Sequence, residues 1–102
     1  MNFSTHNDGR VNINGTSLQG YLEADYQTLK AAFGEPMQCG GPKVKWEWCL
    51  QFEDEEIATV YDWKNYHLSE PEQVVTWHIG GFNRNIFERV KKIIADVQKQ
   101  TA

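Results

Sequence analysis

The clearest pattern along the chain is a strict alternation of apolar and polar residues from Lys43 to Phe52. Such an alternation predicts an antiparallel strand with one buried face, because successive side chains of a strand point to opposite sides of the sheet. The four acidic residues that follow, Glu53 to Glu56, predict a solvated turn. The apolar positions on the expected buried face are Val44, Trp46, Trp48, Leu50 and Phe52.

Two further strands are expected after this turn. Ile57 to Trp63 predicts a returning strand, with Ile57, Thr59, Tyr61 and Trp63 on one side and Ala58, Val60 and Asp62 on the other. Both sides contain apolar residues, so the inward side is ambiguous. Val74 to Ile79 predicts a third strand that Gly80-Gly81 ends, and its expected inward residues are Val75, Trp77 and Ile79.

The N-terminal part predicts a β-hairpin. Asn14-Gly15 lies between the extended runs Val11 to Ile13 and Thr16 to Leu22, and both turn residues tolerate a positive φ. Gly20 within the second run indicates a bulge. The expected inward residues of that run are Leu18 and either Tyr21 or Leu22. Residues 1–9 are expected to form a flexible lead-in, which only Phe3 could anchor.

Helical periodicity is found in two segments. Tyr26, Leu29 and Phe33 share one helical face after Asp25, a suitable N-cap, and Gly34 and Pro36 end that helix before a predicted loop over residues 35–42. A second helix is expected to start near Asn85, with Glu88 three residues later. Its apolar stripe is Ile86, Phe87, Val90, Ile93, Ile94 and Val97.

The predicted order is therefore β-β-α-β-β-β-α. It indicates an α+β fold of two layers, in which two helices pack on one face of a single antiparallel sheet. The domain is expected to span residues 10–102. The other sheet face would be open and available to a partner, and it would carry Lys43, Lys45, Glu47, Cys49, Gln51, Ala58, Val60 and Asp62.

Composition narrows the classes of function. The chain has 102 residues, a net charge of −4 and no long apolar run, so we expect no membrane span and no tight binding of nucleic acid by bulk charge. Met1 to Arg10 lacks an apolar stretch, so no secretory signal is expected. Two cysteines cannot form a disulfide framework, which favours a reducing cytoplasm.

The candidate chemistry is sparse. Cys49 and His78, with His67 and Asp62, could form a nucleophile and base, but no motif connects them, so no catalytic residue is assigned. The His and Cys spacings match no metal site, and no cofactor is expected. Gly80 and Gly81 before the last helix, with Arg84, form a weak candidate for anion binding, since helix N-termini attract anions.

The aromatic residues and the acidic turn are the candidate contact residues. Trp63 and Tyr66 lie where a strand opens into a loop, and Asp62 and Lys64 flank Trp63 with opposite charges. Trp and Tyr are common at interface hot spots. The predicted contact set is Asp62, Trp63, Lys64 and Tyr66, together with the acidic residues Glu53, Asp54, Glu55 and Glu56.

Several runs together resemble a family of small uncharacterised bacteriophage proteins, over residues 11 to 95. The most specific runs are Tyr61-Asp62-Trp63-Lys64 and Trp77-His78-Ile79-Gly80-Gly81, and the other runs are Gly15 to Tyr21, Leu29 with Phe33 to Pro36, Lys43-Val44, Trp46 to Trp48 and Ala58 to Val60. The chain departs from the family pattern at Glu53 to Glu56, where a glycine is expected in the turn.

The resemblance implies a protein that acts in the cytoplasm of an infected bacterium. Small acidic phage proteins without catalytic motifs commonly inhibit host defence, so the main hypothesis is a non-catalytic protein that blocks a CRISPR–Cas effector or a restriction enzyme by occlusion. A protein that sequesters a nucleotide signal through Arg84, the Gly80-Gly81 loop and an aromatic residue is the first alternative. A phage assembly component and an enzyme using Cys49 and His78 are the others.

Overall fold

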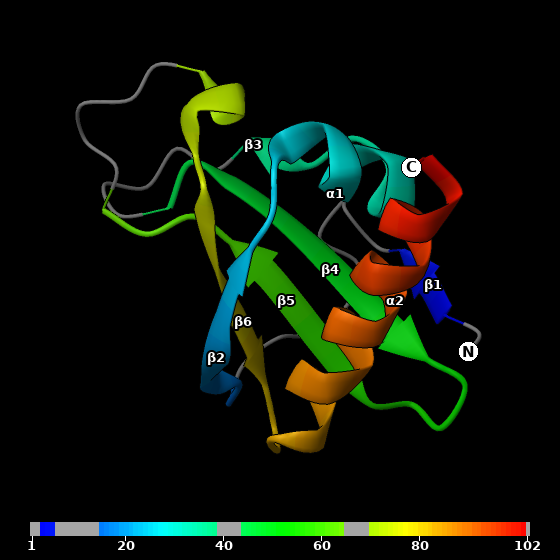
Figure 1. Ribbon diagram of the computed structural model, residues 1–102. Coiled ribbons are helices and arrows are strands. Elements are labelled where there is room, and N and C mark those ends of the chain that lie inside the picture. The colour runs from blue at the N-terminus through cyan, green and yellow to red at the C-terminus, as the bar shows by residue number, and fades with distance from the viewer. Residues whose placement is uncertain (1–2, 6–14, 39–43, 65–69, 102) are drawn as a thin grey trace.

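The computed structural model describes residues 3–5, 15–38, 44–64 and 70–101 of the chain. These residues form an antiparallel sheet with two α-helices on one of its faces, which confirms the predicted α+β fold (Figure 1). The strands lie in the order β1-β4-β5-β6-β2, and β3 pairs with β4. In chain order the elements are β1 (Phe3–Thr5), β2 (Ser17–Glu23), α1 (Tyr26–Phe33), β3 (Met37–Gln38), β4 (Trp46–Phe52), β5 (Ile57–Tyr61), the 3-10 turn η1 (Pro71–Gln73), β6 (Thr76–Gly81) and α2 (Asn85–Thr101).

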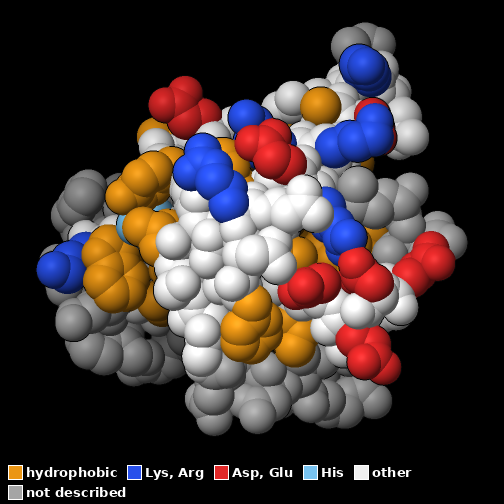
Figure 2. All heavy atoms as spheres, turned by 90° about the horizontal axis from the view of Figure 1, so that it is seen from below, with side chains coloured by type: hydrophobic (Ala, Val, Ile, Leu, Met, Phe, Trp, Pro, Cys, Tyr) orange, Lys and Arg blue, Asp and Glu red, His pale blue; other side chains and the backbone are white. Residues whose placement is uncertain are grey.

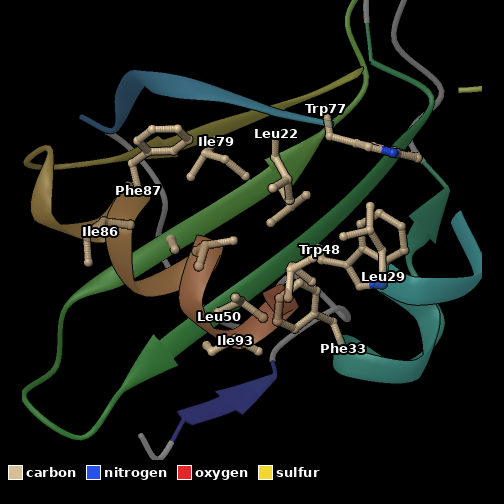
Figure 3. Close-up of a cluster of buried hydrophobic side chains, with 14 of the residues drawn as sticks. Leu22, Leu29, Phe33, Trp48, Leu50, Trp77, Ile79, Ile86, Phe87 and Ile93 are labelled. Carbon is tan, nitrogen blue, oxygen red and sulfur yellow. The ribbon is translucent and has the colours of Figure 1, made fainter. Parts of the chain in front are cut away.

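The core lies between the helices and the sheet (Figure 3). Two fully buried tryptophans, Trp48 and Trp77, meet edge to face with ring centroids 5.2 Å apart. The Trp48 indole N–H donates to the Gly34 carbonyl at 2.7 Å, and the Trp77 indole N–H donates to the Ala24 carbonyl at 3.1 Å. These two carbonyls lie just after and just before α1, so the indoles attach both ends of the helix to the sheet.

The termini of α1 follow the sequence prediction. Asp25 is the N-cap, and its carboxylate accepts a hydrogen bond from the Thr28 backbone N–H at 3.1 Å. Gly34 follows the helix with a φ of 82°, a conformation that favours glycine, and its N–H donates to the Lys30 carbonyl. Tyr26, Leu29 and Phe33 are the buried residues of this helix.

Three predicted boundaries differ from the structure. Phe3–Thr5 is not part of a flexible lead-in but pairs with β4, because the Phe3 ring packs between Phe33 and Phe52 at 5.7 and 6.2 Å. Met37–Gln38, expected in a loop, also pairs with β4. Gly80 and Gly81 belong to β6 rather than ending it. The first strand of the predicted hairpin, Val11 to Ile13, lies outside the described residues.

The inward side of several strands also differs from the prediction. Ala58, Val60 and Asp62 are fully buried, so β5 turns Ile57, Thr59 and Tyr61 towards the open face. This resolves the inward side that the sequence left ambiguous, and it corrects the expectation that Ala58, Val60 and Asp62 lie on the open face. In β2 Leu22 faces the core, whereas Leu18 and Tyr21 are exposed. The predicted bulge at Gly20 is confirmed as a register shift against β6. Val75 is exposed and Val74 buried, because β6 begins only at Thr76 and the alternation does not extend before it.

Candidate functional site

The open face of the sheet carries a row of aromatic side chains. Tyr61 of β5 is paired with His78 of β6, and His78 is paired with Tyr21 of β2. Residues paired across neighbouring strands point to the same face, so these three rings lie side by side. Glu47 of β4 continues the row on the other side of Tyr61.

These rings and Trp63 surround a pocket of about 420 Å³, lined by Leu18, Tyr21, Tyr61, Trp63 and His78. We call these five residues the aromatic patch. Figure 2 shows it as hydrophobic side chains gathered around a histidine, with a Lys or Arg side chain beside them. The volume lies within the range of about 300–1,000 Å³ that is usual for ligand pockets.

The rings of the aromatic patch hold one another in place. His78 meets Tyr21 edge to face at 4.9 Å, and it also contacts Tyr61 at 5.5 Å and Trp63 at 5.9 Å between ring centroids. Three of the five residues remain well exposed, with 43% of Leu18, 59% of Tyr21 and 39% of Trp63 accessible to solvent. Exposed rings that are already ordered lose little entropy on binding, which suits a contact surface.

Burial sets the protonation of this surface. It lowers the pKa of His78 below 6.5, an effect that the negative charge of Asp62 partly opposes, so the imidazole is neutral at pH 7. Burial, assisted by the nearby Glu47 carboxylate, raises the pKa of Tyr61. Burial also raises the pKa of Glu47. At pH 7 the aromatic patch therefore carries a neutral imidazole, together with the phenols of Tyr21 and Tyr61 and the indole of Trp63.

A second hollow of about 370 Å³ adjoins the aromatic patch at β2 and shares Leu18 and Tyr21 with it; its other lining residues are Gln19, Gly20, Arg84 and Phe87. We call it the Arg84 pocket. The Arg84 guanidinium lies 5.4 Å from the centre of the Phe87 ring. Gly80 and Gly81 are not part of it, because both are paired on either side, with β5 and with β2. The predicted glycine loop that would bind an anion is therefore a strand, and Arg84 is the part of that prediction that lines a pocket.

The two glycines have a packing role instead. A Cβ atom on Gly80 would lie 2.4 Å from the Thr59 hydroxyl, and one on Gly81 would lie 3.0 Å from the Ile86 side chain. Such distances are too short for non-bonded atoms, so any larger residue would have to displace its neighbours.

Asp62 was predicted to contact a partner, but the structure places it in the interior, with no exposed surface. Its Oδ1 accepts hydrogen bonds from the backbone N–H groups of Lys45 at 2.8 Å and Trp46 at 3.0 Å. Its Oδ2 is buried and has no hydrogen-bond partner. The Asp62 side chain therefore connects the end of β5 to the start of β4, so its role is to stabilise the sheet.

The two residues that follow Asp62, Trp63 and Lys64, are exposed, as the prediction of a contact surface requires. Trp63 belongs to the aromatic patch, and the Lys64 ammonium lies 5.8 Å from the centre of the Trp63 ring. Lys64 has a φ of 54°, a conformation uncommon for a residue with a side chain. Tyr66, the remaining aromatic residue of the predicted contact set, lies outside the described residues.

The acidic turn is not purely solvated. Asp54 accepts a bidentate pair of hydrogen bonds from Arg89 of α2, at 2.9 and 2.6 Å. This guanidinium lowers the pKa of Asp54 to about 2. Glu56 accepts from the Asn83 side chain at 3.2 Å. Glu55 has a φ of 70°, so it occupies the conformation for which a glycine was expected in this turn.

The nucleophile and base considered from the sequence are not in contact. Cys49 and His78 are on the same face, as expected, but β5 separates their strands, and strands are spaced about 4.8 Å apart. Cys49 is 1% exposed and lies in the row of Thr59, not in the row of His78. Across the described ranges, no three His, Cys, Asp or Glu side chains are grouped as metal ligands would be.

The sequence predicted that Trp63 is exposed, which the structure confirms, but it did not predict that Leu18, Tyr21 and Tyr61 gather beside it on one surface. The sequence did contain a sign of this surface, because its alternation places Tyr61 and Trp63 on the same side of their strand. This could not be used while the inward side of that strand was ambiguous, while Leu18 was expected in the core and either Tyr21 or Leu22 was expected to face inward.

Comparison of the chain with models of known protein families, with curated protein sequences and with solved structures gives no match. The resemblance to bacteriophage proteins therefore stays a prediction. No described helix is both long and apolar enough to cross a membrane.

Proposed function

We propose that this protein is a non-catalytic binding protein that uses the aromatic patch as its contact surface. The observation that supports the proposal is the gathering of Tyr21, Trp63 and Leu18, all well exposed, around a half-buried His78. Large apolar side chains on a sheet face that no described helix covers are typical of protein contact sites.

The proposed target is a defence complex of a bacterial host, either a CRISPR–Cas effector or a restriction enzyme, which the protein would inhibit by occlusion. This part of the proposal is supported by the resemblance to bacteriophage proteins. Occlusion requires only a stable contact, which agrees with a surface that is aromatic and carries neutral polar groups at pH 7.

Inhibition of purified enzymes tests the proposal. DNA cleavage by a panel of CRISPR–Cas effectors and restriction enzymes would be measured with increasing amounts of the protein. We expect inhibition of at least one enzyme, and we expect the double substitution Tyr21→Ala with Trp63→Ala to weaken it about 100-fold, since interface aromatics each contribute about 1–3 kcal/mol.

The matched control is Val75→Ala, which truncates a residue that is 69% exposed and lies outside the aromatic patch. Full inhibition by the double variant, or an equal loss with Val75→Ala, would contradict the aromatic patch as the contact surface. Failure to inhibit any enzyme of the panel would contradict the proposed target class.

One observation favours a second candidate function, the sequestering of a nucleotide. The aromatic patch can stack a base, and the adjoining Arg84 pocket offers a guanidinium for a phosphate. Stabilisation of the protein against heat by nucleotides, lost on Arg84→Ala, would establish this function. No change in melting temperature with any nucleotide would rule it out.

A further inference from the structure

We propose that strand β2 is the docking edge of the sheet, to which an extended segment of the partner protein adds as a further antiparallel or parallel strand. We infer that this segment alternates apolar and acidic side chains. The proposal rests on the proposed function as a binding protein and specifies how the partner is held.

Among the described strands, β2 pairs only with β6. Val11 to Ile13, which the sequence predicts as its hairpin partner across Asn14-Gly15, lies outside the described residues, so occupation of this edge by the chain itself is the outcome that hydrogen exchange tests below. The Ala24 N–H donates to the Val75 carbonyl at 3.2 Å, so Ala24 directs its backbone groups towards β6. Along an antiparallel strand, the backbone N–H and C=O groups of successive residues point alternately to the two neighbouring positions in the sheet. The backbone groups of Leu22 therefore also point towards β6, whereas those of Tyr21 and Glu23 point away from the sheet. These outward groups are a template for an additional strand.

Two residue types that commonly prevent a further strand from pairing at a sheet edge are missing from β2. Ser17–Glu23 contains neither lysine nor proline, and its charged residue is Glu23. The bulge between Leu18 and Gly20 interrupts only the first part of the strand. The other end of the sheet is formed by β1, which is three residues long. The regular stretch from Gly20 to Glu23 is therefore the better site for pairing.

The two pockets adjoin each other at this edge, where both are lined by Leu18 and Tyr21. A Cβ atom on Gly20 would lie 2.7 Å from the Phe87 ring of α2, so Gly20 points to the helical face, where the Arg84 pocket lies. Tyr21, the next residue, points to the open face, where it lines the aromatic patch, and it also lines the Arg84 pocket. Successive side chains of an added strand would also alternate between the faces, so one would reach the aromatic patch and the next the Arg84 pocket.

The surroundings of the pockets specify the side chains that fit them. The aromatic patch carries a neutral imidazole at pH 7 and is otherwise lined by aromatic rings and Leu18, so it suits a leucine, isoleucine or aromatic side chain. In the Arg84 pocket, the Arg84 guanidinium lies 5.4 Å from the centre of the Phe87 ring, and the Lys91 ammonium, from outside the pocket lining, lies 5.0 Å from the same ring. Arg84 is exposed and forms no salt bridge with any described carboxylate. An acidic side chain at the next position of the partner segment would complement this charge.

Synthetic peptides test the inference directly. The probe is a capped octapeptide of alternating leucine and glutamate, and the control is the same peptide with lysine in place of glutamate. Calorimetric titration of the full chain should show that the glutamate peptide binds at least tenfold more tightly. Arg84→Glu should reverse this preference. Equal binding of both peptides to the wild-type protein would overturn the inferred charge pattern.

The main-chain part of the inference is tested by Glu23→Pro. A proline removes the outward N–H without removing a hydrogen bond to β6, and its ring blocks an added strand. We expect the affinity for the glutamate peptide to fall about tenfold or more, whereas the matched variant Glu23→Ala should bind as the wild type does. Unchanged affinity of a folded Glu23→Pro variant would overturn strand addition.

Amide hydrogen exchange supplies a measurement that needs no variant. In the free protein the amides of Tyr21 and Glu23 should exchange rapidly and that of Leu22 slowly, and the peptide should protect Tyr21 and Glu23. Protection of both amides in the free protein would show that this edge is already occupied and would overturn the proposal. If Glu23→Pro inhibits the target enzyme fully while Tyr21→Ala with Trp63→Ala does not, the proposed function stands and strand addition is wrong.

Discussion

Replacing Asp62 by alanine should destabilise the protein strongly, although the sequence placed this residue at a contact surface. The carboxylate is fully buried, and its Oδ1 holds the backbone N–H groups of Lys45 and Trp46 at 2.8 and 3.0 Å. The Asp62 N–H also donates to the Trp46 carbonyl at 3.3 Å. Alanine would leave both N–H groups without their acceptor at the start of β4.

The magnitude follows from these two hydrogen bonds. A hydrogen bond to a charged group contributes about 1.5–3 kcal/mol, and a buried N–H without a partner costs about 1–3 kcal/mol. Trp46 is buried, whereas Lys45 is partly exposed and can recover a bond to water. We therefore expect a loss of about 3 kcal/mol, against a total stability of about 5–10 kcal/mol for a domain of this size. Asp62→Asn keeps an acceptor oxygen without its charge and should lose less.

Urea denaturation followed by tryptophan fluorescence measures this effect. With a slope of about 1–1.5 kcal/mol per molar urea, the midpoint of Asp62→Ala should fall by about 2–3 M. Asp96→Ala, on the exposed face of α2, is the matched control and should leave the midpoint unchanged. The reasoning is refuted if Asp62→Ala unfolds at the same urea concentration as the control, or if Asp62→Asn is the less stable of the two Asp62 variants.

Three other substitutions have defined outcomes. Gly20→Ala should lower stability by about 1–3 kcal/mol, because its Cβ would lie 2.7 Å from the Phe87 ring, and Phe87→Leu should restore part of the loss in a double-mutant cycle of urea midpoints. Glu55→Gly should raise the melting temperature, with a gain of about 1 kcal/mol, since it relieves a side chain at a φ of 70°; a lower melting temperature would contradict this. Because Arg89 lowers the pKa of Asp54 to about 2, the ionised pair stabilises the protein above about pH 4, and this contribution is lost as the pH falls through about 2. The difference in urea midpoint between the wild type and Asp54→Asn should therefore shrink over that range, and a constant difference would contradict the pairing.

Local patterns predicted most of the elements because each depends on neighbouring residues. The N-cap at Asp25, the positive φ at Gly34 and the alternation from Trp46 to Phe52 are each recorded within a few positions of the chain. The bulge at Gly20 was predicted for the same reason. Phe3 was missed because its partners, Phe33 and Phe52, are far away in the sequence.

The candidate site was only partly predictable. Trp63 and Lys64 were identified by residue type and by their place at the end of a strand. The aromatic patch additionally required the pairing of Tyr61 with His78 and of His78 with Tyr21, which no local pattern contains. Asp62 shows the opposite error, because a charged residue next to an exposed tryptophan was taken to be exposed itself.

The fold class, the two helices and the strands of the central meander could be predicted from the sequence alone, since hydrophobic periodicity and capping residues act over short distances. The buried face of β4 was predictable too, whereas the faces that β2 and β5 turn inward became clear only in the folded protein. In β5, where both sides are apolar enough to be buried, burial of Ala58 and Val60 against the helices leaves Tyr61 on the open face. The sheet register then brings Tyr61, His78 and Tyr21 together, because a pair of residues opposite each other on two strands must share a face.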